Sequence, residues 1–282
     1  MNKGFSQSLN STLPISTTIV SGSIHNFNAK TNRNSEGTLM CKIISVISCK
    51  GGVGKTTSAV NISAYLKMQK KRVCAVDLDA QHNLSRHFGV HPLSSSDKPT
   101  ITDLFLGAID DYEDETMERL VHESICRTNT VDVIPSTVRL SSLEAVLSTA
   151  TNREHLLEYI LSFIKEDYDY IFLDCHPGLD LFSINALTAS DSVLIPVEAH
   201  ILSSDGLEQV EKMIRTVQRK LNPRLQIEGI IITKYQGHTS CCRQVYDIVK
   251  RDFGSHIHIF EEPVKYAIKV AEAPTFGVSL HE

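Results

Sequence analysis

Apolar and polar positions follow two different periods along most of the chain. Short runs rich in Val, Ile and Leu are typical of buried strands, and longer stretches with apolar residues three or four positions apart are typical of helices. The predicted strands are 42–48, 72–79, 130–136, 168–175, 191–198, 225–235 and a short one near 256–260. The predicted helices are 57–70, 101–107, 114–125, 139–148, 152–166, 204–221 and 240–253. This alternation predicts an α/β fold, a doubly wound and mostly parallel sheet with helices on both faces.

Residues 1–39 interrupt this pattern, because they are rich in Ser, Thr and Asn and have no helical or strand period. Their composition predicts a disordered N-terminal extension. A single Arg and no clear amphipathic helix argue against a transit peptide, and a secretory signal would need a positively charged start before an apolar stretch. Met40 directly precedes the first predicted strand and is the simpler start of translation. We therefore expect one folded domain at 40–282.

The composition narrows the class of protein in three respects. No apolar run approaches the ~20 residues of a membrane helix, so we expect no membrane span. The seven cysteines lack C-x-x-C spacing, which fits a reduced cytosol and argues against a disulfide framework or a zinc ribbon. The net charge of −5 does not indicate nucleic-acid binding, although residues 211–282 carry 11 Lys and Arg against 8 Asp and Glu. A basic excess this small is typical of a solvated face.

A glycine-rich loop lies between the first predicted strand and the first predicted helix, which is the context in which such a loop binds phosphate. Its backbone N–H groups and the N-terminus of the helix bind phosphate oxygens. Lys55 would reach the β- and γ-phosphates, and the Thr56 hydroxyl would bind Mg²⁺. The ordinary pattern begins with glycine, where this chain has Lys50. The predicted nucleotide-binding residues are Lys50, Gly51, Gly52, Val53, Gly54, Lys55, Thr56 and Thr57.

Three aspartates end predicted strands at the edge of the sheet where ligands bind in such folds. Asp174 follows a run of Ile, Phe and Leu, which is the usual arrangement for a carboxylate that holds Mg²⁺ directly or through water. Asp79 lies just beyond its strand, where a carboxylate could orient an attacking water. Asp77 would support either the magnesium shell or the loop. The predicted metal-binding residues are Thr56, Asp77 and Asp174, and the predicted catalytic residues include Lys55 and Asp79.

Several stretches resemble one family closely. They are CKGGVGKTTSAVN, VDLDAQHNLS, VIPSTVRLSSLE, the run from YDYIFLDCHPG to SSDGLEQV, IEGIIITKYQGHTSCCRQV and KVAEAPTFG, and they extend from Met40 to about Gly277. The chain resembles the ParA/Soj ATPases of plasmid and chromosome partition, which are P-loop NTPases of the deviant Walker A type, a group that includes MinD. NALTASDSVLIPV and EAPTFG favour ParA within this group.

The resemblance implies an ATP hydrolase that uses ATP and Mg²⁺ and forms a homodimer with ATP between the subunits. Lys50 would then be catalytic, because the extra lysine of this family reaches the partner's nucleotide, as an arginine finger does in other NTPases. Asp79 would orient the attacking water. The ATP dimer would bind non-specific DNA, and a ParB-like centromere-binding protein would stimulate a slow hydrolysis. The expected location is cytoplasmic and nucleoid-associated.

The family's DNA contacts come from basic residues late in the chain. Arg243 and Lys269 match such positions, and Lys265 lies nearby. These side chains would bind phosphates, so binding should be independent of sequence and sensitive to salt. The alternative is that all three lie on a solvated helix face.

The chain departs from the family pattern at several positions. The commonest DPQGN is DAQHN at 79–83, which keeps Asp79, and DCPPS is DCHPG at 174–178. We expect His176 to be a local hydrogen-bonding residue and not a catalyst. His238 replaces a common arginine, and 264–267 replace the IPRN segment near the base. No adenine contact is therefore assigned.

The sequence also bears on three rival functions. MinD-like membrane recruitment requires a C-terminal amphipathic helix, and TFGVSLHE does not form one. An iron–sulfur protein would need well-placed cysteines, and the adjacent Cys241 and Cys242 are not spaced for a cluster. An orphan ParA/MinD-type ATPase that positions a non-DNA cargo stays open, because cargo specificity lies in the partner.

Overall fold

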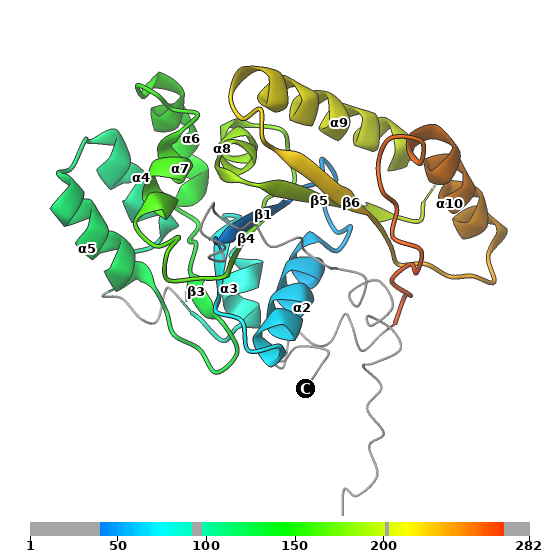
Figure 1. Ribbon diagram of the computed structural model, residues 1–282, viewed down its shortest axis with the longest axis horizontal. Coiled ribbons are helices and arrows are strands. Elements are labelled where there is room, and N and C mark those ends of the chain that lie inside the picture. The colour runs from blue at the N-terminus through cyan, green and yellow to red at the C-terminus, as the bar shows by residue number, and fades with distance from the viewer. Residues whose placement is uncertain (1–39, 92–97, 201–202, 268–282) are drawn as a thin grey trace, which may run out of the picture.

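The centre of the protein is a parallel sheet. The structure is a computed structural model that describes residues 40–91, 98–200 and 203–267. Within this part, six strands pair in the order β3-β2-β4-β1-β5-β6, and every pairing is parallel (Figure 1). The strands are β1 (Lys42–Val46), β2 (Val73–Leu78), β3 (Asp132–Ile134), β4 (Tyr170–Cys175), β5 (Ser192–Glu198) and β6 (Gln226–Thr233).

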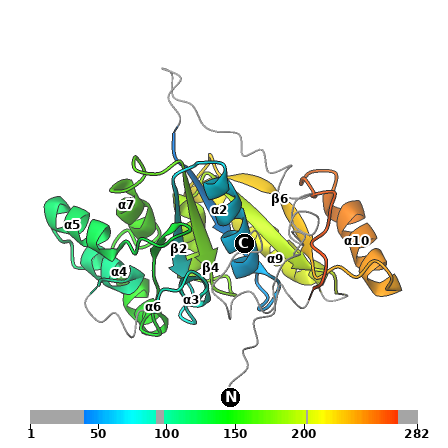
Figure 2. The ribbon, with the colours of Figure 1, turned by 90° about the horizontal axis from the view of Figure 1, so that it is seen from below.

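Helices cover both faces of this sheet. They are α2 (Lys55–Met68), α3 (Asn83–His87), α4 (Ile101–Ile109), α5 (Asp114–Ser124), α6 (Leu140–Thr149), α7 (Leu156–Ser162), α8 (Leu181–Ala189), α9 (Ser203–Lys220) and α10 (Ser240–Phe253). Helices α2 and α3 pack on one face, and α4 to α9 pack on the other. Helices α5 and α10 lie at opposite ends of the molecule (Figure 2). The predicted doubly wound α/β fold is confirmed.

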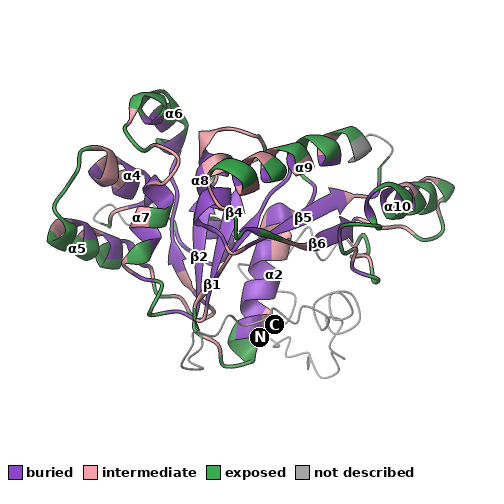
Figure 3. Cartoon of the chain, turned by 45° about the horizontal axis from the view of Figure 1, so that its top comes forward, coloured by how far each residue is buried: buried purple, intermediate pink, exposed green. Residues whose placement is uncertain are grey.

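The central elements are buried almost completely. Every residue of β2 and β4 is buried, as expected for parallel strands covered on both faces. Helix α2 is buried without a break from Ala59 to Ala64, so it has no broad solvent face (Figure 3). The helix is therefore packed closely against the middle of the sheet.

The strand register brings three predicted site elements together. Asp174 pairs with Val46 at the end of β1 on one side and with Asp77 of β2 on the other. The glycine-rich loop follows β1 directly. Because the strands are parallel, their carboxyl ends meet at one edge, and ligands bind there in open α/β sheets.

The chain returns along β6 after α10. Of the predicted strand near 256–260, only an isolated parallel bridge at Ile259 is present, and a second bridge follows at Lys265. Pro263, which has no N–H to donate, lies between the two bridges. The contacts along this edge join Ile230 to Ile259, Tyr235 to Val264 and Lys265, and Tyr266 to Tyr235. This pairing carries 264–267 to the carboxyl end of the sheet.

Two predictions about domain organisation are not tested by the structure. The predicted extension at 1–39 lies outside the described residues, and the single domain at 40–282 stays a prediction. Within the described ranges, none of the helices combines the length and the apolar character that a membrane crossing needs.

Candidate nucleotide-binding site

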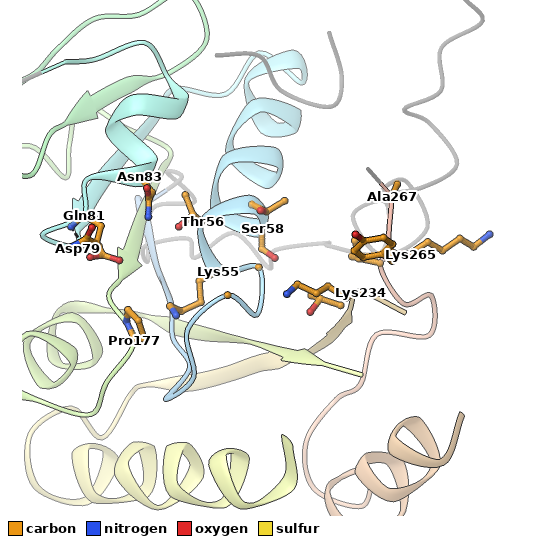
Figure 4. Close-up of a pocket in the computed structure, with 16 residues that line it drawn as sticks. Lys55, Thr56, Ser58, Asp79, Gln81, Asn83, Pro177, Lys234, Lys265 and Ala267 are labelled. Atoms are coloured by element: carbon orange, nitrogen blue, oxygen red, sulfur yellow. Dashed lines mark hydrogen bonds between the residues drawn. The ribbon is translucent and has the colours of Figure 1, made fainter. Parts of the chain in front are cut away.

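A cavity of about 390 Å³ opens at the carboxyl end of the sheet, a size typical of small-molecule sites (Figure 4). Its walls come from the glycine-rich loop, the first turn of α2, the loop after β2, the end of β6 and the segment 264–267. The lining residues are Gly52, Gly54, Lys55, Thr56, Thr57, Ser58, Asp79, Gln81, Asn83, Pro177, Thr233, Lys234, Val264, Lys265, Tyr266 and Ala267. Five of the predicted loop residues are therefore part of one site.

The loop backbone requires glycine at two positions. Gly52 and Gly54 have φ values of +73° and +89°, in the left-handed region that other residues rarely adopt. Gly54 is also the N-cap of α2, so the free N–H groups of the first helical turn begin at this point. A side chain at Gly54 would contact Thr233, and the loop lies close against the end of β6. This geometry forms a backbone cradle suited to an anion.

Lys55 is buried at the bottom of the cradle. Its side chain begins the first turn of α2, and its Nζ donates to the carbonyl oxygen of Lys50 at 3.2 Å. Burial lowers the pKa of Lys55, and the Asp174 carboxylate opposes this shift. A buried ammonium with one neutral acceptor has further donors to offer, and phosphate oxygens would accept them.

Asp174 has the chemistry expected of a cation ligand. It is 1% exposed, and neither of its carboxylate oxygens makes a well-aligned hydrogen bond within the described chain. Burial raises its pKa well above the ordinary value and Asp77 adds to this, while the Thr56 hydroxyl and Lys55 lower it in part. Buried polar atoms are normally satisfied, and Mg²⁺ commonly uses one or two carboxylates together with substrate phosphates. Asp174 and Thr56 therefore fit a magnesium ion.

Asp77 has a different environment. One of its oxygens accepts bonds from the Ser85 N–H at 2.8 Å and the Ser85 hydroxyl at 2.7 Å, and the other accepts the Asp79 N–H at 3.1 Å. Burial raises its pKa to about 6, against the effect of these hydrogen bonds. Both oxygens already hold the loop between β2 and α3. Of the two predicted roles, these contacts favour loop support over direct metal binding.

Asp79 lies half-buried on the cavity wall (Figure 4). Its Oδ1 accepts the Gln81 N–H at 2.9 Å, which fixes the turn that leads into α3. A carboxylate at this place, beyond the end of β2 and beside the loop, suits the orientation of a water molecule. The role in catalysis stays a prediction.

Lys50 is exposed and does not line the cavity that holds Lys55. It lies instead beside a second pocket of about 220 Å³, with Cys49, Glu198 and Gly206 at the start of α9. An exposed lysine that does not line its own cavity is accessible to another subunit. Its contact with a partner's nucleotide stays a prediction.

The predicted DNA-binding residues are spread over the late part of the chain. Arg243 is exposed on α10. Lys265 is exposed at the rim of the cavity, and Figure 4 shows its side chain directed away from the loop. Lys269 lies outside the described residues. Their role in DNA binding stays a prediction.

His176 is a local hydrogen-bonding residue, as expected. Its Nε2 lies 2.9 Å from a carboxylate oxygen of Asp180, whose hydrogen bond raises the pKa of the imidazole. Asp180 also caps α8 by accepting the Ser183 N–H at 3.0 Å. The pair thus fixes the turn between β4 and α8, beside Pro177 on the cavity wall.

Sequence reasoning missed the wall formed by β6 and the segment after it. Thr233 and Lys234 line the cavity, and so do the residues from Val264 to Ala267, for which no base contact was predicted. The position of Thr233 and Lys234 at a strand's carboxyl end was a usable signal. No local motif marked 264–267, because its position depends on pairing with β6.

The Thr233 hydroxyl fastens the loop to β6, since it donates to the Val53 carbonyl oxygen at 2.7 Å. Thr233→Val keeps the shape of the side chain but leaves that carbonyl unpaired. We expect the free energy of unfolding to fall by about 1–2 kcal/mol, measured by urea denaturation. Thr233→Ser keeps the hydroxyl and serves as the control. Equal unfolding midpoints for the Val variant and the unaltered protein would contradict this role.

Fold and site together define a P-loop protein that binds a nucleoside triphosphate, with an additional lysine at the first position of the loop. Residues 41–227 match the AAA domain family AAA_31. The chain is 37% identical over 241 residues to the sporulation initiation inhibitor protein Soj of Bacillus subtilis, with 84% of this chain and 89% of that protein covered. It is 35% identical over 236 residues to the chromosome partitioning protein ParA of Myxococcus xanthus, with 84% and 79% covered. The chain belongs to the Soj/ParA family.

A solved structure gives a similar fold. Cobyrinic acid a,c-diamide synthase from Mycobacterium smegmatis, crystallised with bound ADP and magnesium, is 28% identical, with a TM-score of 0.71 over 84% of this chain and 93% of that one. The predicted resemblance to the ParA/Soj family is confirmed by the two relatives.

Proposed function

We infer that the protein is a partition ATPase of plasmids or chromosomes, which uses ATP and Mg²⁺. One observation carries this inference: in a chain of the Soj/ParA family, the P-loop and Lys55 lie at the same end of the sheet as the Asp174 carboxylate, which is buried and makes no well-aligned hydrogen bond among the described residues. The loop supplies phosphate binding and the carboxylate supplies metal binding, which are the two requirements of phosphoryl transfer. The names of the relatives support chromosome partition as the process.

The residues divide the work of hydrolysis between them. The loop backbone from Gly51 to Thr57 and the Lys55 ammonium bind the phosphates, and Thr56 and Asp174 hold Mg²⁺. Held by these residues, Mg²⁺ would supply positive charge to the β- and γ-phosphates. Asp79 orients the attacking water, and Asp77 holds the loop that carries Asp79.

Dimerisation and DNA binding complete the proposed cycle. ATP joins two subunits, and Lys50 of each adds positive charge at the nucleotide of the other. The dimer binds DNA through Arg243, Lys265 and Lys269, without regard to sequence, and so associates with the nucleoid in the cytoplasm. A ParB-like protein accelerates a slow hydrolysis, which separates the subunits and releases the DNA.

Sedimentation with random-sequence DNA tests this proposal. The purified chain is spun with DNA in ATP, in ADP and without nucleotide, at low and moderate salt. We expect binding with ATP alone and a loss of binding as salt rises, because phosphate contacts release counterions. Binding in no nucleotide state would contradict the DNA-binding function and favour the alternative, an orphan ATPase that positions another cargo.

Asp79→Ala tests the water-orienting role. The variant keeps the loop, Lys55 and Asp174, so we expect normal ATP binding. Turnover should fall about 100-fold or more, because a positioned acid–base group contributes on that scale. The stalled variant should accumulate as an ATP dimer in size-exclusion chromatography. Normal turnover would remove Asp79 from this role.

A further inference from the structure

Lys234 is a third lysine at the nucleotide cavity. It directly follows Thr233 at the carboxyl end of β6 and lines the cavity with the glycine-rich loop. Its Nζ lies 3.9 Å from the point where a Cβ on Gly52 would stand. Figure 4 shows its ammonium directed toward the loop, in contrast to that of Lys265.

The backbone at Lys234 is in an uncommon conformation. Its φ of +51° lies in the left-handed region, which costs free energy for a residue with a side chain. Such conformations persist where the surroundings hold them, and they cluster at ligand sites. Here the preceding hydroxyl of Thr233 is bonded to Val53, and the next residue, Tyr235, is paired with Val264. The fold therefore fixes the backbone on both sides of Lys234.

The contact of Lys234 with Glu198 is weak. The Nζ lies 3.4 Å from Glu198 Oε1, longer than the roughly 2.7–2.9 Å of a strong charge-assisted bond. The Lys234 side chain is 40% exposed, so solvent screens the pair. An ammonium held this loosely is available to a stronger anionic partner.

A bound nucleotide would bring such a partner to Gly52. Backbone N–H groups of the loop hold the phosphates at close range, and glycine permits that approach. The flexible stem and three donors of a lysine let its ammonium follow an anion over a short distance. The anionic oxygens would be those of the polyphosphate, and the neutral hydroxyls of the ribose are the other acceptors that a nucleotide offers to a lysine.

We propose that Lys234 binds the nucleotide in its own subunit, exchanging the Glu198 carboxylate for nucleotide oxygens beside Gly52. This inference rests on the proposed ATPase function, and it adds a contact distinct from those of Lys55 and Lys50. Glu198 becomes a competitor of the nucleotide for the same ammonium. Nucleotide binding therefore separates Lys234 from Glu198.

Affinity measurements on the full chain test the contact. Lys234→Met keeps the length of the stem and removes the charge, and Lys250→Met, on the exposed surface of α10, is the matched control. Isothermal titration with MgATP and MgADP should give about tenfold weaker binding for Lys234→Met, since a charged hydrogen bond has roughly this effect. The control should bind as the unaltered protein does. Unchanged affinity of Lys234→Met for both nucleotides would overturn the proposal.

Competition with adenosine, which has the ribose but no phosphate, shows whether the Lys234 ammonium binds polyphosphate or ribose oxygens. If the ammonium binds the polyphosphate, Lys234→Met loses affinity for ATP and ADP but keeps that for adenosine. If it binds the ribose, the same fold-loss extends to adenosine. Both results support the contact between Lys234 and the nucleotide, and they distinguish polyphosphate from ribose oxygens as its acceptors.

The exchange with Glu198 has its own test. Glu198→Gln removes the competing charge, so it should tighten ATP binding by a few-fold in the unaltered background and have no such effect when Lys234 is Met. An equal effect in both backgrounds would overturn the exchange. Failure of the unaltered protein to bind ATP would refute the ATPase function itself, an outcome distinct from these.

Discussion

Lys55→Ala is expected to abolish nucleotide binding. The side chain is buried at the bottom of the loop, where the charge of its ammonium opposes the raised pKa of Asp174. Truncating one partner of a buried, hydrogen-bonded charge pair between ligand and protein costs about 2–5 kcal/mol, and each 1.4 kcal/mol is tenfold in affinity. Binding of MgATP should therefore weaken by more than about 100-fold in isothermal titration.

Lys67→Ala is the matched control for this loss. Lys67 lies in the last turn of the same helix, and its side chain is exposed. Helix propensity changes little on substitution by alanine at such a position. Retention of tight ATP binding by Lys55→Ala would refute the phosphate-loop assignment.

Lys50→Ala is expected to separate binding from hydrolysis. Lys50 lines no part of its own nucleotide cavity, so the variant should bind ATP normally. Hydrolysis should fall by a factor of roughly 10³ or more, the scale of an arginine finger supplied by another chain. ATP-dependent dimerisation, measured by sedimentation velocity, should fall with it. A Lys50→Ala variant with unaltered turnover and dimerisation would refute a role in trans.

Mixed dimers decide whether Lys50 acts across the interface. A Lys50→Ala subunit keeps its own Asp79, and an Asp79→Ala partner would supply the missing lysine. One complete site then forms, so mixing the two inactive variants should restore ATP turnover. If Lys50 acted within its own subunit, each site would keep a defect and the mixture would stay inactive.

The central strands were predictable because burial on both faces leaves continuous apolar runs. The predicted strands 72–79 and 168–175 enclose β2 and β4 with an error of at most two residues at either end. Helices with an exposed face were predicted equally well, and α10 has the predicted bounds, 240–253. In these elements the local pattern and the tertiary environment agree.

Helix α8 was not predicted, although it packs against the centre of the fold. Seven of its nine residues are buried, so it has no polar face and no amphipathic period. Helix α3 is too short, at five residues, to show a period. The predicted helix 152–166 is regular only from Leu156 to Ser162, and Asn152 has a positive φ of 54°.

The residues of the candidate site likewise fall into a group that the sequence predicted and a group that it did not. The loop from Lys50 to Thr57 is consecutive in the chain, so its chemistry is visible as a motif. Asp77 and Asp174 end predictable strands, and the parallel register brings them together. Lys234 and the segment 264–267 reach the cavity through pairing at the edge of the sheet, which no local pattern encodes.

Because β6 lies at the edge of the sheet, the two walls of the nucleotide cavity should differ in how well they tolerate amino-acid substitutions. The phosphate half rests on β1, β4 and α2, where a change in one side chain disturbs close-packed neighbours on both faces. The other wall, the segment 264–267, is joined to the edge strand β6 and to Tyr235 by a few backbone hydrogen bonds. New side chains at 264–267 can therefore reshape this wall without repacking the centre. Variants with altered base preference should be sought there, because the hydrolytic parts would be left intact.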